Sequence, residues 1–125
     1  MLPTVLVFIG GGIGSALRHG VNQAAARLLG TGFPYGTLTV NIVGSFFMGL
    51  LAGYFAFKGE ATQAWRLFLT TGILGGFTTF SAFSLDAALI YERGQMGMAL
   101  AYVLVSVGVS IAALFLGLFL VRQWS

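Results

Sequence analysis

Long apolar segments dominate the chain, and charged residues interrupt them only rarely. The uncharged runs are residues 1–17, 28–57, 67–85 and 94–121. An α-helix rises about 1.5 Å per residue and the hydrocarbon core of a bilayer is about 30 Å thick, so one span needs roughly 20 residues. The pattern predicts an all-α membrane protein whose single transmembrane domain occupies residues 1–125. Its four predicted transmembrane helices lie at about residues 2–28, 37–57, 65–91 and 97–121.

Two short connectors separate the first three predicted spans. Residues 31–36 combine helix-breaking glycine and proline with two aromatic side chains, which suit a membrane interface. A polar link after the second span carries Lys58, Glu60 and Gln63. Neither connector is large enough to fold alone, so we expect no domain outside the membrane.

The third predicted span is interrupted near its middle. Glycine and β-branched threonine, both poorer helix formers than alanine, crowd this region at Gly72, Gly75, Gly76, Thr78 and Thr79. A broken helix frees backbone carbonyls, and such backbone survives at membrane depth only where it is buried in protein or meets a cavity or an ion. Carbonyls from two copies that meet at a two-fold axis would suit a hard monovalent cation in a structural role.

Composition excludes a soluble globular protein. Hydrophobic residues make up 58% of the chain and charged residues 7%, against about 25% charged residues in a typical soluble domain. The net charge of +3 comes from six scattered Lys and Arg residues, which form no basic stripe to follow nucleic-acid phosphates. The chain has no cysteine, one histidine and no paired carboxylates in mid-membrane. We therefore expect neither an enzyme nor a nucleic-acid partner.

The basic residues divide evenly between the two sides of the predicted bundle. Those on the side of the N-terminus are Lys58, Arg66 and Arg122, and those on the other side are Arg18, Arg27 and Arg93. Basic residues normally set the orientation of a membrane protein, so an even division gives no preferred one. It either reflects the small number of charges or indicates dual topology, in which copies insert both ways and pair antiparallel.

Small residues recur every four positions on three of the predicted spans. The sets are Gly10 and Gly14, then Ser45, Gly49 and Gly53, then Gly72 and Gly76. Such faces let helix backbones approach closely in lipid. They pack either within one bundle or between copies, and three faces in four helices favour an oligomer.

Polar side chains mark the second and fourth spans. Asn41 shares a helix face with Ser45, and a buried amide needs a partner, so it either bonds a neighbouring helix or lines a wet path. The nearby Thr37 and Thr39 favour the path. On the fourth span, Tyr102, Ser106 and Ser110 recur every four residues and place three hydroxyls in one stripe. A lone serine often bonds its own helix, but three hydroxyls in register indicate a polar track.

The distribution of charge favours an anion as the occupant of that track. No acidic residue precedes Glu60, and Asp86 and Glu92 fall near the end of the third span. Arg18 is the only intramembrane charge of the first two predicted spans, because Arg27 falls at the end of the first. A cation path or proton relay would normally need a carboxylate near mid-membrane. The hydroxyl track alone does not fix the sign of the ion, because a hydroxyl can donate to an anion or accept from a cation.

Phe80 and Phe83 are neighbours on one helical face of the third span. Two phenylalanines in a membrane helix ordinarily serve packing. Here they stand among threonines and serines, and an aromatic ring has a positive edge that can coordinate a small anion without a full charge. Weak coordination suits conduction, since an ion must leave as easily as it enters.

Three segments together resemble a known family. The sequences GGGIGSALR (residues 10–18), GTLTVNIVGSFFMG (36–49) and GGFTTFSAFS (75–84) are similar to the three signatures of the Fluc/CrcB family of small fluoride channels. The match extends in order over all four predicted spans. Two positions depart from the family pattern. Ala82 stands where the family often has threonine, and His19 follows Arg18 where an aromatic residue is common.

The resemblance implies an antiparallel, dual-topology homodimer with two fluoride pathways at the subunit interface. It also implies a central structural sodium ion (Na+), held by backbone oxygens of Gly75 and Thr78 from both copies. The implied pathway residues are Arg18 near a vestibule, the pore side chain Asn41, the rings of Phe80 and Phe83, and the hydroxyls of Tyr102, Ser106 and Ser110.

The implied function is passive export of fluoride across a bacterial inner (plasma) membrane, with fluoride, a second copy and the lipid bilayer as partners. One alternative is a small multidrug-type proton-coupled transporter, which has a similar size but relies on a glutamate in its first span. Another is an accessory membrane subunit without transport of its own, which would leave the hydroxyl track and Arg18 unexplained.

Overall fold

The structure, a computed structural model, describes residues 1–58 and 63–124 and is almost entirely helical. The first two helices are α1 (Leu2–Leu29) and α2 (Tyr35–Lys58). The third span is composed of α3 (Gln63–Arg66), the π-helix η1 (Leu67–Leu74), α4 (Gly75–Phe77) and α5 (Ser81–Glu92). The last helix is α6 (Met96–Trp124). The part of the predicted polar link that includes Glu60 lies outside the described residues.

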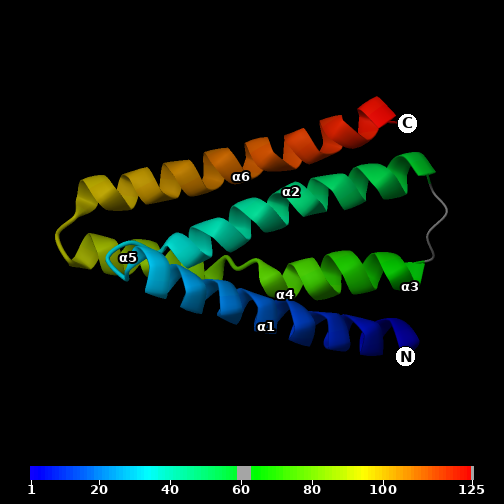
Figure 1. Cartoon of the computed structure of the whole chain (residues 1–125), viewed down its shortest axis with the longest axis horizontal. Coiled ribbons are helices and arrows are strands. Elements are labelled where there is room, and N and C mark those ends of the chain that lie inside the picture. Colours follow the sequence, from blue (N-terminus) through cyan, green and yellow to red (C-terminus); the bar gives the residue numbers. More distant parts are fainter. Residues whose placement is uncertain (59–62, 125) are drawn as a thin grey trace.

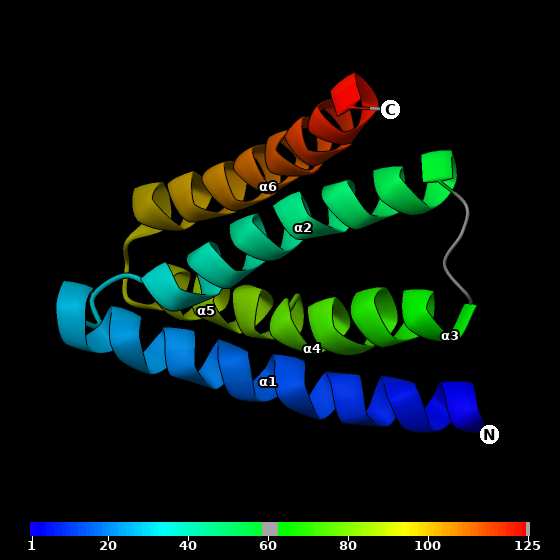
Figure 2. The same cartoon turned by 45° about the vertical axis from the view of Figure 1, so that its right-hand side comes forward.

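The four spans run side by side as a bundle with both chain ends at the same end (Figure 1). α6 packs along α2, whereas α1 packs along η1 and α4, so α1 and α6 lie on opposite sides of the bundle (Figure 2). The segments long and apolar enough to cross a membrane are Leu2–Leu29, Tyr35–Ala56, Gln63–Glu92 and Met96–Gln123. The prediction of a four-helix membrane protein is therefore confirmed, and each end of these segments lies within two residues of the expected bound.

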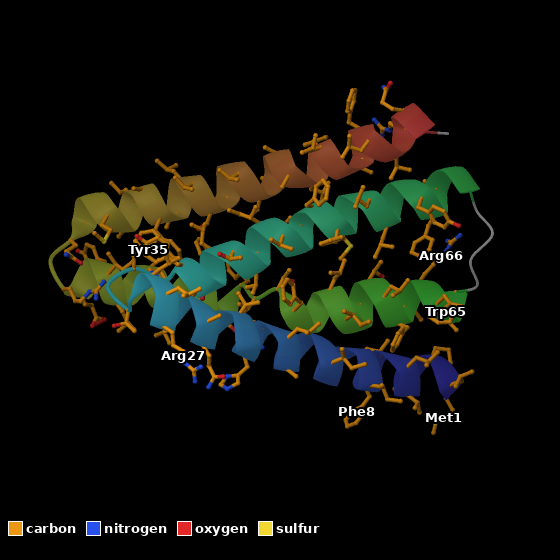
Figure 3. The ribbon with its side chains drawn as sticks, viewed as in Figure 1. Met1, Phe8, Arg27, Tyr35, Trp65 and Arg66 are labelled. Atoms are coloured by element: carbon orange, nitrogen blue, oxygen red, sulfur yellow. The ribbon has the colours of Figure 1, made fainter. Side chains whose placement is uncertain are left out.

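The outer surface of the bundle is apolar. Large hydrophobic side chains are exposed along α1 and α6, among them Phe8, Leu104 and Phe115. Figure 3 shows Phe8 and Arg27 pointing away from the rest of the bundle. In water such a surface would be unfavourable, whereas lipid tails solvate it, so the surface fits a chain embedded in a bilayer.

Glycines allow close contact between α1 and the third span. A Cβ on Gly14 would overlap the backbone carbonyl of Ile73, and one on Gly10 would lie 2.8 Å from the carbonyl oxygen of Phe68. Gly49 of α2 likewise packs on the backbone of Leu114. These faces are therefore occupied within one chain. The spacing of these small residues favoured an oligomer in the sequence analysis. Because the faces already pack within one chain, they do not support contact between copies.

The third span breaks where the sequence predicted. α4 ends at Phe77, and Thr78 is extended, with φ −87° and ψ 161°. The chain becomes helical again at Ser81. The π-helical turns of η1 were not predicted, because threonine and glycine content does not distinguish wide helical turns from a simple break. The break lies near the midpoint of the 30-residue span Gln63–Glu92 and hence near mid-membrane.

Candidate functional site

Asn41 fixes the conformation of the break. Its Nδ2 donates a hydrogen bond to the backbone carbonyl of Thr79 at 2.9 Å, and the backbone N–H of Thr79 donates to Asn41 Oδ1 at 2.8 Å. Outside a helix, these backbone groups need partners at membrane depth. The amide of Asn41 therefore supplies two hydrogen bonds that a continuous helix would otherwise provide.

Two backbone carbonyls at the break lose their usual helical partners. In a continuous helix the Thr79 N–H would bond the carbonyl of Gly75, but it donates to Asn41 instead. The N–H of Ala82, which would bond the carbonyl of Thr78, donates to Thr79 Oγ1 at 3.1 Å. Gly75 is also exposed on the surface of the chain. The carbonyls of Gly75 and Thr78 are thus available to a ligand.

A cavity of about 250 Å³ lies beside the break, between α2, α5 and α6. Five predicted pathway residues line it, namely Asn41, Phe80, Phe83, Ser106 and Ser110. They come from segments far apart in the sequence, and the fold brings them together in the middle of the bundle. Ser45, Thr78 and Thr79 add further polar groups to the same wall.

The two phenylalanine rings at this cavity differ in exposure. Phe83 is 8% exposed and packs in the core, whereas Phe80 is 77% exposed. Their ring centroids are 5.6 Å apart and the planes are tilted by 51°. Ring edges carry partial positive charge, so the pair presents weak anion-coordinating groups beside the hydroxyls. The exposed ring leaves the cavity open to the outside of a single chain.

Ser106 and Ser110 bring two unused hydrogen-bonding groups to the cavity. The Oγ atoms of both are buried and have no hydrogen-bond partner among the described residues. Leaving a buried hydroxyl unpaired costs about 1–3 kcal/mol. Because neither serine bonds the carbonyl four residues before it, as a lone helical serine often does, both are free to coordinate an ion or water.

Tyr102 lies apart from the two serines, although the three share a helix stripe. Its side chain is fully buried, and its hydroxyl donates to Asp86 Oδ2 at 3.3 Å. Its ring packs on Phe83, with centroids 5.2 Å apart. Tyr102 therefore stands behind the cavity and contacts it through Phe83. The predicted track divides into two serines that line the cavity and one buried tyrosine that does not.

Arg18 is not brought to this cavity. It lies half-buried on α1, and the cavity is formed by α2, the break, α5 and α6. The described residues also contain no group of three or more His, Cys, Asp or Glu side chains that would hold a metal ion.

A second cavity, of about 380 Å³, lies at the end of the bundle where α1 meets α2. The connector carrying Phe33, together with Asp86 and Arg93, contributes to its wall. The sequence placed Phe33 at the membrane interface, but its ring is half-buried against Tyr102, with centroids 5.3 Å apart. The alternation of glycine and aromatic residues in the connector gave no signal for this inward orientation.

Comparison with known proteins places the chain in a family. The family model described as "CrcB-like protein, Camphor Resistance (CrcB)" matches residues 5–118. A protein of Rhodopseudomonas palustris (strain BisB5), named fluoride-specific ion channel FluC, is 63% identical over 94% of this chain and 95% of its own length. A protein of the same name from Methylobacterium nodulans is 60% identical over 99% of both chains. Since the family model and these full-length relatives agree, the chain belongs to the CrcB-like family.

Proposed function

We propose that the chain is a fluoride-selective channel that lets fluoride leave the cell passively and lowers its concentration in the cytoplasm. The relatives named fluoride-specific ion channel, at 52–63% identity over nearly the whole chain, support this function. The observation that carries it is the mid-membrane cavity, where the unpartnered hydroxyls of Ser106 and Ser110 stand beside the rings of Phe80 and Phe83.

The chemistry of the cavity suits a small anion that must be released again. Hydroxyl groups donate hydrogen bonds that replace water around the anion, and ring edges add weak electrostatic attraction. Among the residues that the structure describes, no Lys or Arg lines the cavity to trap a negative ion. Entry is then favourable and exit is easy, which conduction requires. No bond is made or broken in this process, so the protein is an ion channel and not an enzyme.

The conducting unit is an antiparallel, dual-topology homodimer. Basic residues occur at both ends of the bundle, since α3 ends in Arg66 at one end and α1 carries Arg27 near the other (Figure 3). The cavity opens to the outside of the chain at Phe80, which is 77% exposed. Lipid tails cannot hydrogen-bond the serine hydroxyls or the amide of Asn41. A second copy over this opening would complete the polar wall and give each dimer two pathways.

A sodium ion is proposed at the centre of the dimer, held by the carbonyl oxygens of Gly75 and Thr78 from both copies. The donors fit such an ion: both carbonyls lack their usual helical partners, and hard monovalent cations prefer oxygen ligands. When bound, the ion offsets the partial negative charges of these carbonyls. Asn41 contributes by holding Thr79, and with it the orientation of the break.

Two pathway assignments extend beyond the cavity. Arg18 is proposed to lie near a vestibule, where it attracts anions from solution without lining the narrow part of the pathway. Tyr102 is proposed to support the Phe83 ring from behind. The chain itself is a multi-pass membrane protein, and the bacterial relatives fit a position in the inner membrane.

Liposomes that contain the purified protein and are loaded with potassium fluoride test the proposed function. Once a potassium ionophore is added to balance charge, a fluoride electrode should record rapid fluoride efflux, while liposomes loaded with chloride should release almost none. Protein-free liposomes are the control for leakage. Efflux of chloride at the rate of fluoride, or no flux above the control, would overturn the proposal, and proton-driven transport of organic cations would favour the multidrug-type alternative.

A further inference from the structure

Five aromatic rings form a continuous line from the connector between α1 and α2 to the cavity. In order they are Tyr35, Phe33, Tyr102, Phe83 and Phe80. The successive centroid separations are 4.9, 5.3, 5.2 and 5.6 Å. The line begins at the first residue of α2, where Figure 3 labels Tyr35, and ends at the mid-membrane break.

Phe33 is the member of this line that lies in a connector. It meets the Tyr102 ring at 88°, an edge-to-face contact of the kind that aromatic pairs prefer. It also packs against the core cluster of Phe83, Ile90, Ala99 and Tyr102. A connector residue thus forms part of the core that supports the cavity.

The connector is itself held in place. The Arg93 guanidinium donates from Nη2 to the backbone carbonyl of Gly32 at 3.3 Å, and the N–H of Tyr35 donates to the carbonyl of Phe33 at 2.8 Å. Gly30 has a φ of 84°, which turns the chain sharply after α1. These contacts on either side of Phe33 restrict the position of its backbone, so the ring acts as a fixed support.

The hydroxyl contacts of Tyr102 do not by themselves hold its ring. The bond to Asp86 Oδ2 is 3.3 Å, beyond the 2.5–3.0 Å typical of hydroxyl donors. The Thr37 side chain also bonds this hydroxyl. Both contacts act at the tip of the side chain, so the plane of the ring depends on its packing. The rings of Phe33 and Phe83 both contact the Tyr102 ring and limit how it can rotate or tilt.

We infer that Phe33 is a positioning residue for the anion pathway, which acts through Tyr102 to hold the Phe83 ring at the cavity. This inference rests on the proposed function, because the held ring is the one that coordinates fluoride. Without the Phe33 ring, Tyr102 gains freedom, the edge of Phe83 is no longer fixed, and discrimination between fluoride and a larger anion weakens.

A set of three variants tests the inference in the liposome assay. Phe33→Leu keeps an apolar side chain but removes the ring, Phe33→Tyr keeps the ring, and Phe68→Leu removes a ring from another edge-to-face pair, with Trp65 at 5.8 Å, away from the cavity. We expect Phe33→Leu to lower fluoride efflux about tenfold and to raise the relative chloride flux, because a fixed ring edge is lost. Phe33→Tyr and Phe68→Leu should stay close to the wild-type protein in rate and selectivity.

A second measurement reports on the environment and mobility of the Tyr102 ring and does not depend on conduction. Protein labelled with 3-fluorotyrosine gives a ¹⁹F NMR signal for Tyr102, assigned by its loss in Tyr102→Phe. That signal should broaden in Phe33→Leu, because the ring gains freedom, and keep its line width in Phe68→Leu. A shift without broadening reports only the lost ring current of Phe33 and would overturn the inference. If Phe33→Leu does not yield folded protein, Phe33→Met provides the same comparison, since its flexible side chain fills the space without a ring.

The outcomes separate this inference from the proposed function. A wild-type protein that conducts no fluoride overturns the function, whereas the NMR comparison still reports whether Phe33 positions Tyr102. Unchanged flux, selectivity and Tyr102 signal in Phe33→Leu would overturn the inference. Equal losses in Phe33→Leu and Phe33→Tyr would also overturn it, because the ring would then not be the feature that matters.

Discussion

Asn41 on α2 forms hydrogen bonds with both backbone polar groups of Thr79, which lies 38 residues further along the chain. One side chain therefore stabilises the break in the third span and lines the adjacent cavity. The contact also determines which carbonyls are free, because the N–H of Thr79 no longer bonds Gly75. The conformation of the break and the chemistry of the cavity thus depend on the same amide.

Replacing Asn41 with Ala should destabilise the protein. The change leaves the N–H and carbonyl of Thr79 unpaired, and each unpaired buried polar group costs about 1–3 kcal/mol. Chemical unfolding in detergent measures the difference in free energy. Gln23→Ala is the matched control, since it removes an exposed amide on α1. An equally stable Asn41→Ala protein would show that the hydrogen bonds to Thr79 do not hold the break.

Ser106→Ala and Ser110→Ala should separate stability from conduction. Each removes a buried, unpartnered hydroxyl and leaves a methyl side chain, so stability should stay the same or rise by up to about 1 kcal/mol. Fluoride efflux should fall, because a hydrogen-bond donor to the anion is lost. Ser15→Ala, at an exposed site on α1, serves as the control. Full fluoride flux in both cavity variants would contradict the assigned role of the serine hydroxyls.

Phe80→Ile and Phe83→Ile should both slow fluoride efflux, since an aliphatic side chain has no positive ring edge. Their effects on stability should differ. Phe83 is buried, and removing part of a buried side chain costs about 1–3 kcal/mol, whereas Phe80 is exposed in the single chain. Phe8→Ile, on the exposed face of α1, is the control for both measurements. Wild-type flux in both cavity variants would mean that the rings serve packing alone.

A pair of glycine substitutions on α1 tests the packing of the bundle. Gly14→Ala should destabilise the chain, because the added Cβ overlaps the carbonyl of Ile73. A Cβ on Gly12 would meet no described atom within 4 Å. Gly12→Ala should therefore be neutral or stabilising by up to about 1 kcal/mol, since alanine favours a helix. Equal stabilities of the two variants would contradict the close contact between α1 and η1.

Sodium should stabilise the assembled protein. If carbonyls of Gly75 and Thr78 from two copies hold the ion, thermal unfolding should occur at a lower temperature when sodium is replaced by a large organic cation. The stability should return when sodium is restored, because a ligand that binds only the folded state raises its stability. Size-exclusion chromatography follows the dimer in parallel. A melting temperature independent of sodium would contradict the proposed ion.

Patterns that are local in the chain could be predicted from the sequence. Runs of apolar residues indicated four spans, and the glycines and threonines before Phe80 placed the break. The four-residue spacing of Ser106 and Ser110 predicted that both share one helix face, and in the structure both line the cavity. Each of these features depends on helix periodicity or on the propensity of neighbouring residues, which a single sequence carries.

Features that depend on contacts between distant segments could not be predicted. The bond between Asn41 and Thr79 requires α2 to lie against the break, and the turn of Tyr102 toward Asp86 requires the α5–α6 packing. The inward position of Phe33 depends on the same core. The pairing of Gly14 with Ile73 explains why small-residue faces that suggested an oligomer are occupied within one chain.

The central claim is that fluoride crosses the membrane passively and carries its charge with it. The most direct test follows fluoride efflux from liposomes loaded with potassium fluoride and suspended in potassium-free medium. Efflux should begin only when a potassium ionophore allows charge to be balanced, and an imposed proton gradient should not drive it. Fluoride efflux that proceeds without the ionophore and follows the proton gradient would contradict a channel mechanism.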